Sequence, residues 1–138
     1  MNMLEAIAVL EKEVPNPSRG LPDPVFYYIS KTTPLVNVDL LIKDEDGRTL
    51  LAWRNDPYAG AGWHIPGGII RFKETFVHRI RQVALTEVGT EVEFNPVPVA
   101  LHEIILPDAD IRGHFISLLY NCSLGRDFVP ANNGLAPK

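Results

Sequence analysis

Length, composition and charge set the first limits on what the chain can be. It has 138 residues, of which 46% are hydrophobic and 22% charged, which is the size and composition of one globular domain. A formal charge of −4 is unsuited to non-specific nucleic-acid binding, and the apolar runs are shorter than the roughly 20 residues that a membrane helix needs. No secretion signal opens the sequence. We therefore expect one soluble, cytoplasmic domain that binds neither nucleic acid nor membrane.

The N-terminal residues predict an extension joined to a domain. Apolar residues recur near helical spacing in Met3–Glu13, and the proline-rich segment 15–24 is typical of a linker. Asp23 before a proline is typical of a helix start. We expect residues 1–22 to form a helix and linker, and residues 23–138 to form the domain, beginning with a short helix.

The next segments predict strands and a sharp glycine turn. Leu35–Ile42 is almost continuously apolar, which indicates a buried strand and makes Asp39 within it conspicuous. The acidic turn at 44–47 favours a hairpin in which Thr49–Arg54 returns beside that strand. Pro66-Gly67-Gly68 is typical of a sharp turn.

A long amphipathic helix is expected after the glycine turn. Apolar residues recur at three- and four-residue steps within Glu74–Glu87, and Gly89 is placed to close the helix. Further strands are predicted at Val92–Phe94, Val97–Leu106 and His114–Cys122.

The spacing of Gly68, Glu74, Glu87 and Gly89 matches a known motif. Five residues separate Gly68 from Glu74, and a helix then ends in Glu87-Val88-Gly89, which is the frame of the Nudix box, Gx5Ex7REUxEExGU with U aliphatic. In this strand–loop–helix, backbone carbonyls and carboxylates meet as oxygen ligands for a hard cation such as Mg²⁺. The chain thus resembles the Nudix hydrolases.

The box is degenerate in a way that resembles one subfamily. Gln82 stands at the arginine position, and Val83 and Thr86 stand at two glutamate positions. The GDP-mannose mannosyl hydrolases also lack these two glutamates, and segments 33–40, 50–54 and 62–68 are similar to theirs in the same order. In those enzymes water attacks the anomeric carbon of the sugar, which requires fewer carboxylates than attack on phosphorus.

The resemblance implies a fold and a set of ligands. The fold would be the single-domain Nudix α/β/α sandwich, an α/β (α+β) architecture with a mixed β-sheet. Glu87 would bind Mg²⁺ together with a carbonyl of the Gly67-Gly68 turn, for which Gly68 is the candidate. The partner would be a small nucleotide sugar, and the subfamily's dimers imply a homodimer.

It also implies roles for other side chains. Asp39 and Arg54 would face the substrate, and Asp39, Glu74 and Glu87 are the candidate catalytic residues. For Glu74 we favour a structural or supporting duty at the helix start over direct ligation. The subfamily's arginine after the double glycine is absent, and Arg71 is the candidate to replace it at a phosphate.

The family continues, near the point where this sequence stops at Lys138, into a loop with a further metal ligand and a histidine base, then a C-terminal helix. We expect that helix to be missing or truncated in residues 23–138. Either the sequence is cut short or the base is absent. His102 and Glu103 are candidates to replace it, although a structural role is the simpler interpretation for both.

These observations lead to one functional expectation with two alternatives. We expect a Mg²⁺-dependent hydrolase that acts on a nucleoside diphosphate sugar similar to GDP-mannose and releases GDP and free sugar. The first alternative is an ordinary Nudix pyrophosphohydrolase that cleaves at phosphorus. The second is a non-catalytic nucleotide-binding module.

Overall fold

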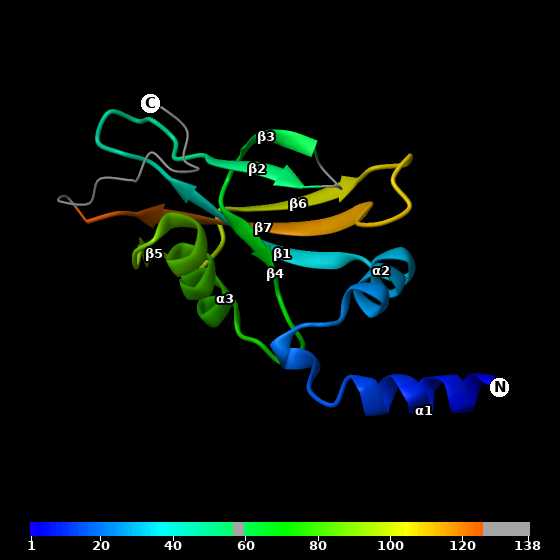
Figure 1. Cartoon of the computed structure of the whole chain (residues 1–138). Helices are drawn as coiled ribbons and strands as arrows, with labels where there is room; N and C mark the ends of the chain where they lie inside the picture. The colour runs from blue at the N-terminus through cyan, green and yellow to red at the C-terminus, as the bar shows by residue number, and fades with distance from the viewer. Residues whose placement is uncertain (57–59, 126–138) are drawn as a thin grey trace.

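The structure is a computed structural model and describes residues 1–56 and 60–125 (Figure 1). Strands form a mixed sheet, with α2 and α3 below it and the β2–β3 hairpin above it in that view. The expectation of a single α/β domain with a mixed sheet is confirmed. The elements are α1 (Met3–Glu13), the 3-10 turn η1 (Pro17–Arg19), α2 (Asp23–Thr32), β1 (Leu35–Ile42), β2 (Ala52–Asp56), β3 (Gly60–His64), β4 (Gly67–Ile69), α3 (Phe76–Val83), the π-helical turn η2 (Ala84–Val88), β5 (Glu93–Phe94), β6 (Ala100–Ile105) and β7 (His114–Ser123).

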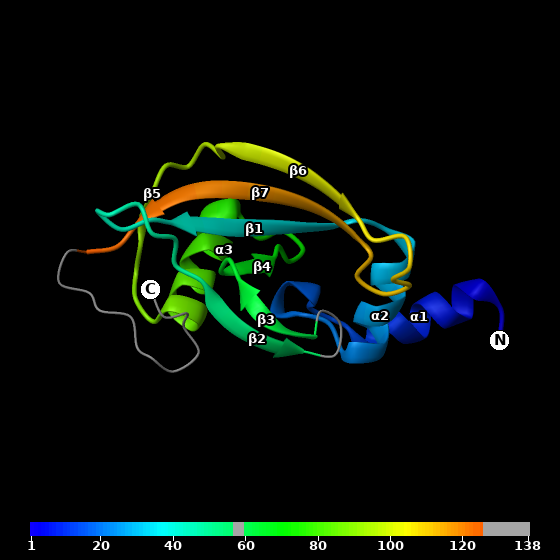
Figure 2. The ribbon, with the colours of Figure 1, turned by 90° about the horizontal axis from the view of Figure 1, so that it is seen from above.

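Strand β1 is central in the main sheet. It pairs in parallel with β7 along its whole length, from Leu35 opposite Phe115 to Ile42 opposite Cys122, and antiparallel with the short β4 on its other edge. Both β5 and β6 pair antiparallel with β7. The strands curve, as seen from above in Figure 2. The side chains of Val38, Leu40 and Ile42 are buried in the core, which explains why segment 35–42 is so apolar.

The predicted hairpin between 35–42 and 49–54 is wrong. β2 pairs instead with β3, where Trp53 lies opposite Trp63, and these two strands form a separate two-stranded sheet. Beyond β1, the backbone pairs across the turn through an isolated bridge between Lys43 and Thr49, and the Leu50 amide donates a hydrogen bond to the Ile42 carbonyl. Turn chemistry predicted the reversal correctly, but the two edges of β1 are taken by β4 and β7.

Gly67 and Gly68 do not form the sharp turn that was expected. They belong to β4, and neither adopts a positive φ angle. Space explains the glycines: a Cβ at Gly67 would collide with the Asp39 carboxylate, and one at Gly68 would lie 2.9 Å from Val83 Cγ2. The two glycines therefore allow β4 to approach both β1 and α3 closely.

The amphipathic helix is confirmed, with two differences. Thr75 is its N-cap and accepts a hydrogen bond from the His78 amide at 3.1 Å, so Glu74 precedes the helix. The last turn is π-helical and ends at Gly89, whose φ is 90°. The apolar side of the helix packs on the sheet in a core of Val38, Leu40, Ile42, Leu50, Ala52, Ile80, Val83, Ala84, Val88, Tyr120 and Cys122.

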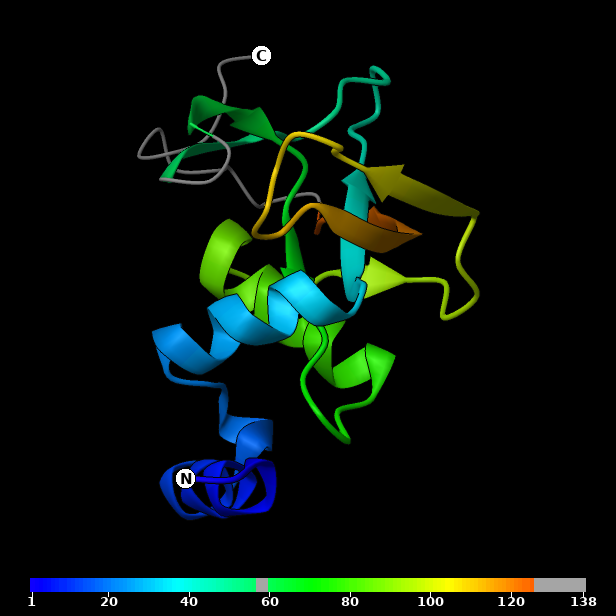
Figure 3. The same cartoon turned by 90° about the vertical axis from the view of Figure 1, so that its right-hand side faces the viewer.

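The N-terminal helix α1 has the predicted bounds but projects from the rest of the chain (Figures 1 and 3). None of its residues is buried. Asn2 caps it by accepting a hydrogen bond from the Glu5 amide at 2.8 Å. No helix in the described part of the chain has the length and apolar character needed to cross a membrane. The expected truncation of a C-terminal helix concerns residues 126–138, which lie outside the described residues.

Candidate active site

A carboxylate, a backbone carbonyl and a guanidinium meet where β2, β4 and η2 come together. The Arg54 Nη2 donates to the Gly67 carbonyl oxygen at 2.9 Å and to Glu87 Oε1 at 2.6 Å. The Gly67 amide donates to Glu87 Oε2 at 2.7 Å. Glu87 therefore points directly at the double glycine, as the box predicts. The side chains of Arg54 and Glu87 are 30% and 23% exposed, so the cluster is open to a ligand from solvent.

Glu87 lies in the π-helical turn η2, at the end of the amphipathic helix. Single π turns inside α-helices are rare and occur frequently at functional sites. The Glu87 carboxylate accepts bonds from β2 and β4 at once, so it joins the hairpin to the main sheet. Successive side chains on β2 point to opposite faces, so Arg54 faces this cluster and Trp53 faces away.

Asp39 stands opposite Gly67 in the β1–β4 register, next to this cluster. The Ser117 hydroxyl donates a hydrogen bond to its carboxylate. Burial raises the pKa of Asp39 above its ordinary value, although the Ser117 bond and the positive charges of Arg54 and His102 act in the opposite direction. A buried carboxylate with a raised pKa is a stronger base than an exposed one, which suits proton transfer.

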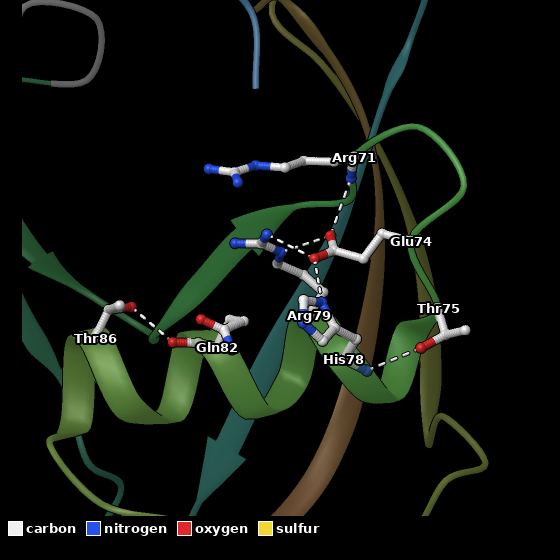
Figure 4. Close-up of polar contacts among 7 residues, drawn as sticks. All are labelled: Arg71, Glu74, Thr75, His78, Arg79, Gln82 and Thr86. Atoms are coloured by element: carbon white, nitrogen blue, oxygen red, sulfur yellow. Dashed lines mark hydrogen bonds and ion pairs between the residues drawn. The ribbon is translucent and has the colours of Figure 1, made fainter. Parts of the chain in front are cut away.

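Glu74 belongs to a second cluster at the start of α3 (Figure 4). It accepts bonds from Arg79 Nε and Nη2, both at 2.7 Å, from the Arg71 amide at 3.1 Å, and contacts His78 Nδ1 at 2.6 Å. Burial opposes the charged form, but these bonds outweigh it and lower the pKa of Glu74 to about 2. The side chain is only 6% exposed. Glu74 thus fixes the loop between β4 and α3, which favours the structural interpretation.

Comparisons with known proteins find sequence relatives, of which two follow. The low-salt glycan biosynthesis protein Agl8 of Haloferax volcanii is 30% identical over 115 residues, which cover 80% of this chain and 72% of that protein. An ADP-ribose pyrophosphatase of Methanocaldococcus jannaschii is 31% identical over 88 residues, and the match spans about half of its length (49%) and 63% of this chain. No protein-family model matches the chain.

Solved structures show the same fold. A Nudix hydrolase of Nitrosomonas europaea superimposes with a TM-score of 0.52 at 25% identity, covering 75% of this chain and 55% of that one. The MutT protein of Methanosarcina mazei Go1 gives 0.58 at 19% identity, with 72% of each chain covered. The chain therefore has the fold of the Nudix hydrolases. A structure of a UDP-X diphosphatase gives 0.55 at 18% identity and covers 96% of this chain and 65% of that one.

Nudix hydrolases generally use a divalent metal, usually Mg²⁺, and the first cluster offers oxygen atoms that fit one. The Gly67 carbonyl and Glu87 Oε1 converge on a single positively charged nitrogen of Arg54, so they already bind a cation. Within 1–56 and 60–125 no group of three or more His, Cys, Asp or Glu side chains is placed to hold a metal. Mg²⁺ is commonly held by one or two carboxylates with waters and substrate phosphates. The carboxylate and the carbonyl are therefore sufficient only if substrate phosphates complete the coordination.

The degenerate positions of the Nudix box carry no charge in this cluster. Thr86 Oγ1 donates back to the Gln82 carbonyl at 2.8 Å, within the helix itself (Figure 4). Val83 is buried in the core, where a glutamate would be an unpaired charge. As a result of these substitutions, Glu87 is the carboxylate of the Nudix box that remains near Gly67.

Arg71 does not join the Glu87 cluster. Its guanidinium lies against the linker, with Cζ 3.7 Å from the position of a Cβ on Gly20. It also borders a hollow formed with the linker around Arg19. Figure 4 shows the side chain extending from the end of β4 away from Glu74. Its predicted phosphate contact stays a prediction.

The candidate bases on β6 lie on opposite faces, as expected for neighbours on a strand. Both residues are exposed: His102 pairs with Ser117 in the β6–β7 register and its charge acts on Asp39, whereas Glu103 lies on the other face of the strand. Ser117 and Arg79 were not predicted, and nothing local in the sequence distinguishes them. Ser117 reaches Asp39 only because β1 and β7 are parallel neighbours.

Proposed function

We propose that this Nudix protein hydrolyses a nucleoside diphosphate sugar similar to GDP-mannose, in a Mg²⁺-dependent reaction in which water attacks the anomeric carbon. The bond between that carbon and the phosphate oxygen breaks, and GDP leaves with the electron pair. A bound Mg²⁺ would supply charge neutralisation for the diphosphate leaving group. The glycan-related name of Agl8 agrees with a sugar-containing substrate.

The observation that carries the proposal is that one carboxylate of the Nudix box, Glu87, hydrogen-bonds to Gly67. Attack on phosphorus in Nudix enzymes relies on several carboxylates that carry more than one metal, whereas a departing diphosphate needs one cation beside it. Glu87 and the Gly67 carbonyl provide that one position. The carbonyl is that of Gly67, the neighbour of the predicted Gly68.

Two side chains around this position would act on the substrate. Arg54 would bind a phosphate oxygen, for which the planar guanidinium is well suited. Asp39 would accept a proton from the attacking water, since burial raises its pKa and makes it the stronger base. Glu74 would keep the β4–α3 loop in place through Arg79.

Hydrolysis in oxygen-18 water tests the proposal directly. Incubation with GDP-mannose and Mg²⁺ should place the label in the released mannose, and mass spectrometry of both products measures it. Label in the phosphate would contradict attack on carbon. A parallel reaction with the Glu87→Gln variant shows whether the labelled product comes from this site.

One observation favours the phosphorus alternative. The ADP-ribose pyrophosphatase relative cleaves, by its name, a pyrophosphate bond, and it is 31% identical over the matched residues. The same labelling experiment with ADP-ribose decides this case, because cleavage at phosphorus puts the label in a phosphate.

A second observation favours a non-catalytic binding module. Arg54 already neutralises Glu87, so the proposed metal ligand has a positive partner without a metal. Calorimetric binding of GDP-mannose with no product after prolonged incubation in saturating Mg²⁺ would support the binding module and contradict hydrolysis.

We also propose that the protein forms a homodimer. The edge strand β6 exposes large apolar side chains, with Leu101 69% and Ile105 56% exposed. Light scattering coupled to size-exclusion chromatography should give twice the chain mass. A monomer at all concentrations would contradict this.

A further inference from the structure

The guanidinium of Arg54 occupies the position that the proposed metal would take. Its Nη2 lies 2.9 Å from the Gly67 carbonyl oxygen and 2.6 Å from Glu87 Oε1, the two oxygens assigned to the cation. Both oxygens therefore bind one positive charge before any ligand arrives. A guanidinium and a divalent cation in the same place would repel each other strongly.

We propose that Arg54 is an exchangeable counter-cation: a divalent ion displaces it from Glu87 and Gly67, and the released guanidinium then binds the diphosphate that accompanies the ion. This inference rests on the proposed function, because it takes the same two oxygens as metal ligands. It adds that Arg54 has two positions, and that the ion displaces the guanidinium before the guanidinium binds the diphosphate.

The position of Arg54 in the fold permits the movement. It lies on β2, and the β2–β3 hairpin pairs with no other strand in the described part of the chain. The side chain is 30% exposed, so solvent reaches the guanidinium. The main sheet, which carries Gly67, does not need to move when the arginine leaves.

The exchange makes metal and nucleotide binding cooperative. Without a nucleotide, a metal must break the Arg54–Glu87 ion pair and leave the arginine without its partner. With a diphosphate present, the arginine gains two charge-assisted hydrogen bonds in return. Metal should therefore bind weakly alone and more tightly with the nucleotide, by a factor in the range of roughly 5–150 that is usual for coupled sites.

Removing the charge of Arg54 should separate these effects. We would measure Mn²⁺ binding without nucleotide, from the electron paramagnetic resonance signal of the free ion, for the wild type, Arg54→Gln and Arg54→Lys. Arg54→Gln should bind Mn²⁺ about tenfold more tightly than the wild type, and Arg54→Lys should resemble the wild type. With Mn²⁺ present, GDP should bind Arg54→Gln about tenfold more weakly.

Arg48→Gln is the matched control. Arg48 is also ion-paired, to Asp44 at 2.6 Å, but in the turn before β2 and not at Glu87. Its loss should change neither Mn²⁺ nor GDP affinity. Equal or weaker Mn²⁺ binding by Arg54→Gln, in a chain whose wild type binds Mn²⁺, would overturn the exchange and leave the metal site intact. Failure of every variant to bind Mn²⁺, with or without GDP, would overturn the proposed function as well.

The unmodified protein offers a second readout. Both tryptophans of the chain, Trp53 and Trp63, lie opposite each other in the hairpin that carries Arg54. Addition of Mg²⁺ and GDP together should change their fluorescence, and GDP without Mg²⁺ should leave it close to that of the free protein. An unchanged spectrum with both ligands bound would contradict release of Arg54.

Discussion

Arg54 and Glu87, 33 residues apart in the chain, form a 2.6 Å ion pair that joins the β2–β3 hairpin to the π-helical end of the Nudix helix. The Gly67 amide and carbonyl complete the contact from β4. The site therefore depends on three elements at once, and each of the following changes alters one of them.

Replacing Glu87 tests the proposed metal ligand. Glu87→Gln should abolish Mg²⁺-dependent turnover, because an amide oxygen lacks the charge that holds the ion. The fold should persist, with a loss of about 1 kcal/mol from the partly exposed ion pair to Arg54. Steady-state kinetics against Mg²⁺ concentration and thermal unfolding measure the two effects. Unchanged metal dependence would remove Glu87 from the mechanism.

Replacing Asp39 tests the proposed base. Asp39→Asn cannot accept the proton, so kcat should fall by roughly 10²–10⁴. In the wild type, activity should fall as acid protonates Asp39, at a pH above its ordinary pKa of 3.8, because burial raises that pKa. The variant should lose this acid limb of its pH–rate profile. An unaltered limb in Asp39→Asn would assign it to another group.

Replacing Glu74 should affect stability more than chemistry. Glu74→Gln leaves Arg79, which is 13% exposed, without its carboxylate, and about 1–3 kcal/mol should be lost for such a poorly satisfied buried group. Urea unfolding measures this loss. If the loss in kcat, expressed as a free energy of activation, exceeds the loss in the free energy of unfolding, Glu74 has a direct catalytic role.

The acid dependence of stability follows from the same residue. The pKa of Glu74 is about 2 in the folded chain against its ordinary value of 4.5, so on acidification the unfolded chain binds the proton first. Its stabilisation is complete above pH 4.5 and disappears between pH 4.5 and about 2. Glu74→Gln should flatten this part of the stability curve. Asp44→Asn is the necessary comparison, because the pKa of Asp44 is also lowered to about 2.

Adding a single methyl group at Gly67 should disturb the whole site. Gly67→Ala places a Cβ against the Asp39 carboxylate and 3.0 Å from the Val38 carbonyl, so β4 must separate from β1 or Asp39 must move. We expect a destabilisation of about 1–3 kcal/mol and loss of turnover. Gly125→Ala is the control, since no atom of residues 1–56 and 60–125 lies within 4 Å of a Cβ there. Equal stability and activity of the two variants would contradict the close approach.

Local signals predicted the helices well and strand partners poorly. The bounds of α1 and the closing Gly89 follow from spacing and capping, which operate over a few residues. The pairing of β1 with β7 joins residues about 80 positions apart, and alternation of apolar residues does not specify a partner. The predicted hairpin failed for this reason.

For the candidate site, too, the sequence predicted some features and not others. The box and the neighbouring segments predicted that Glu87, Arg54 and Asp39 belong together, and the structure brings them together. That Arg54 binds the intended metal ligands was not predictable, because it depends on the π-helical turn and on how the hairpin lies over β4. Arg71 was expected beside a phosphate, but in this fold it contacts the linker at Gly20.

The most direct test of the account is a crystal structure with Mn²⁺ and GDP, in which anomalous scattering locates the ion. We expect one peak about 2.1–2.3 Å from Glu87 and the Gly67 carbonyl, bridged to the diphosphate, with the Arg54 guanidinium turned toward a phosphate oxygen. A peak at Glu74, or an ion bound only to GDP while Arg54 still holds Glu87, would contradict it.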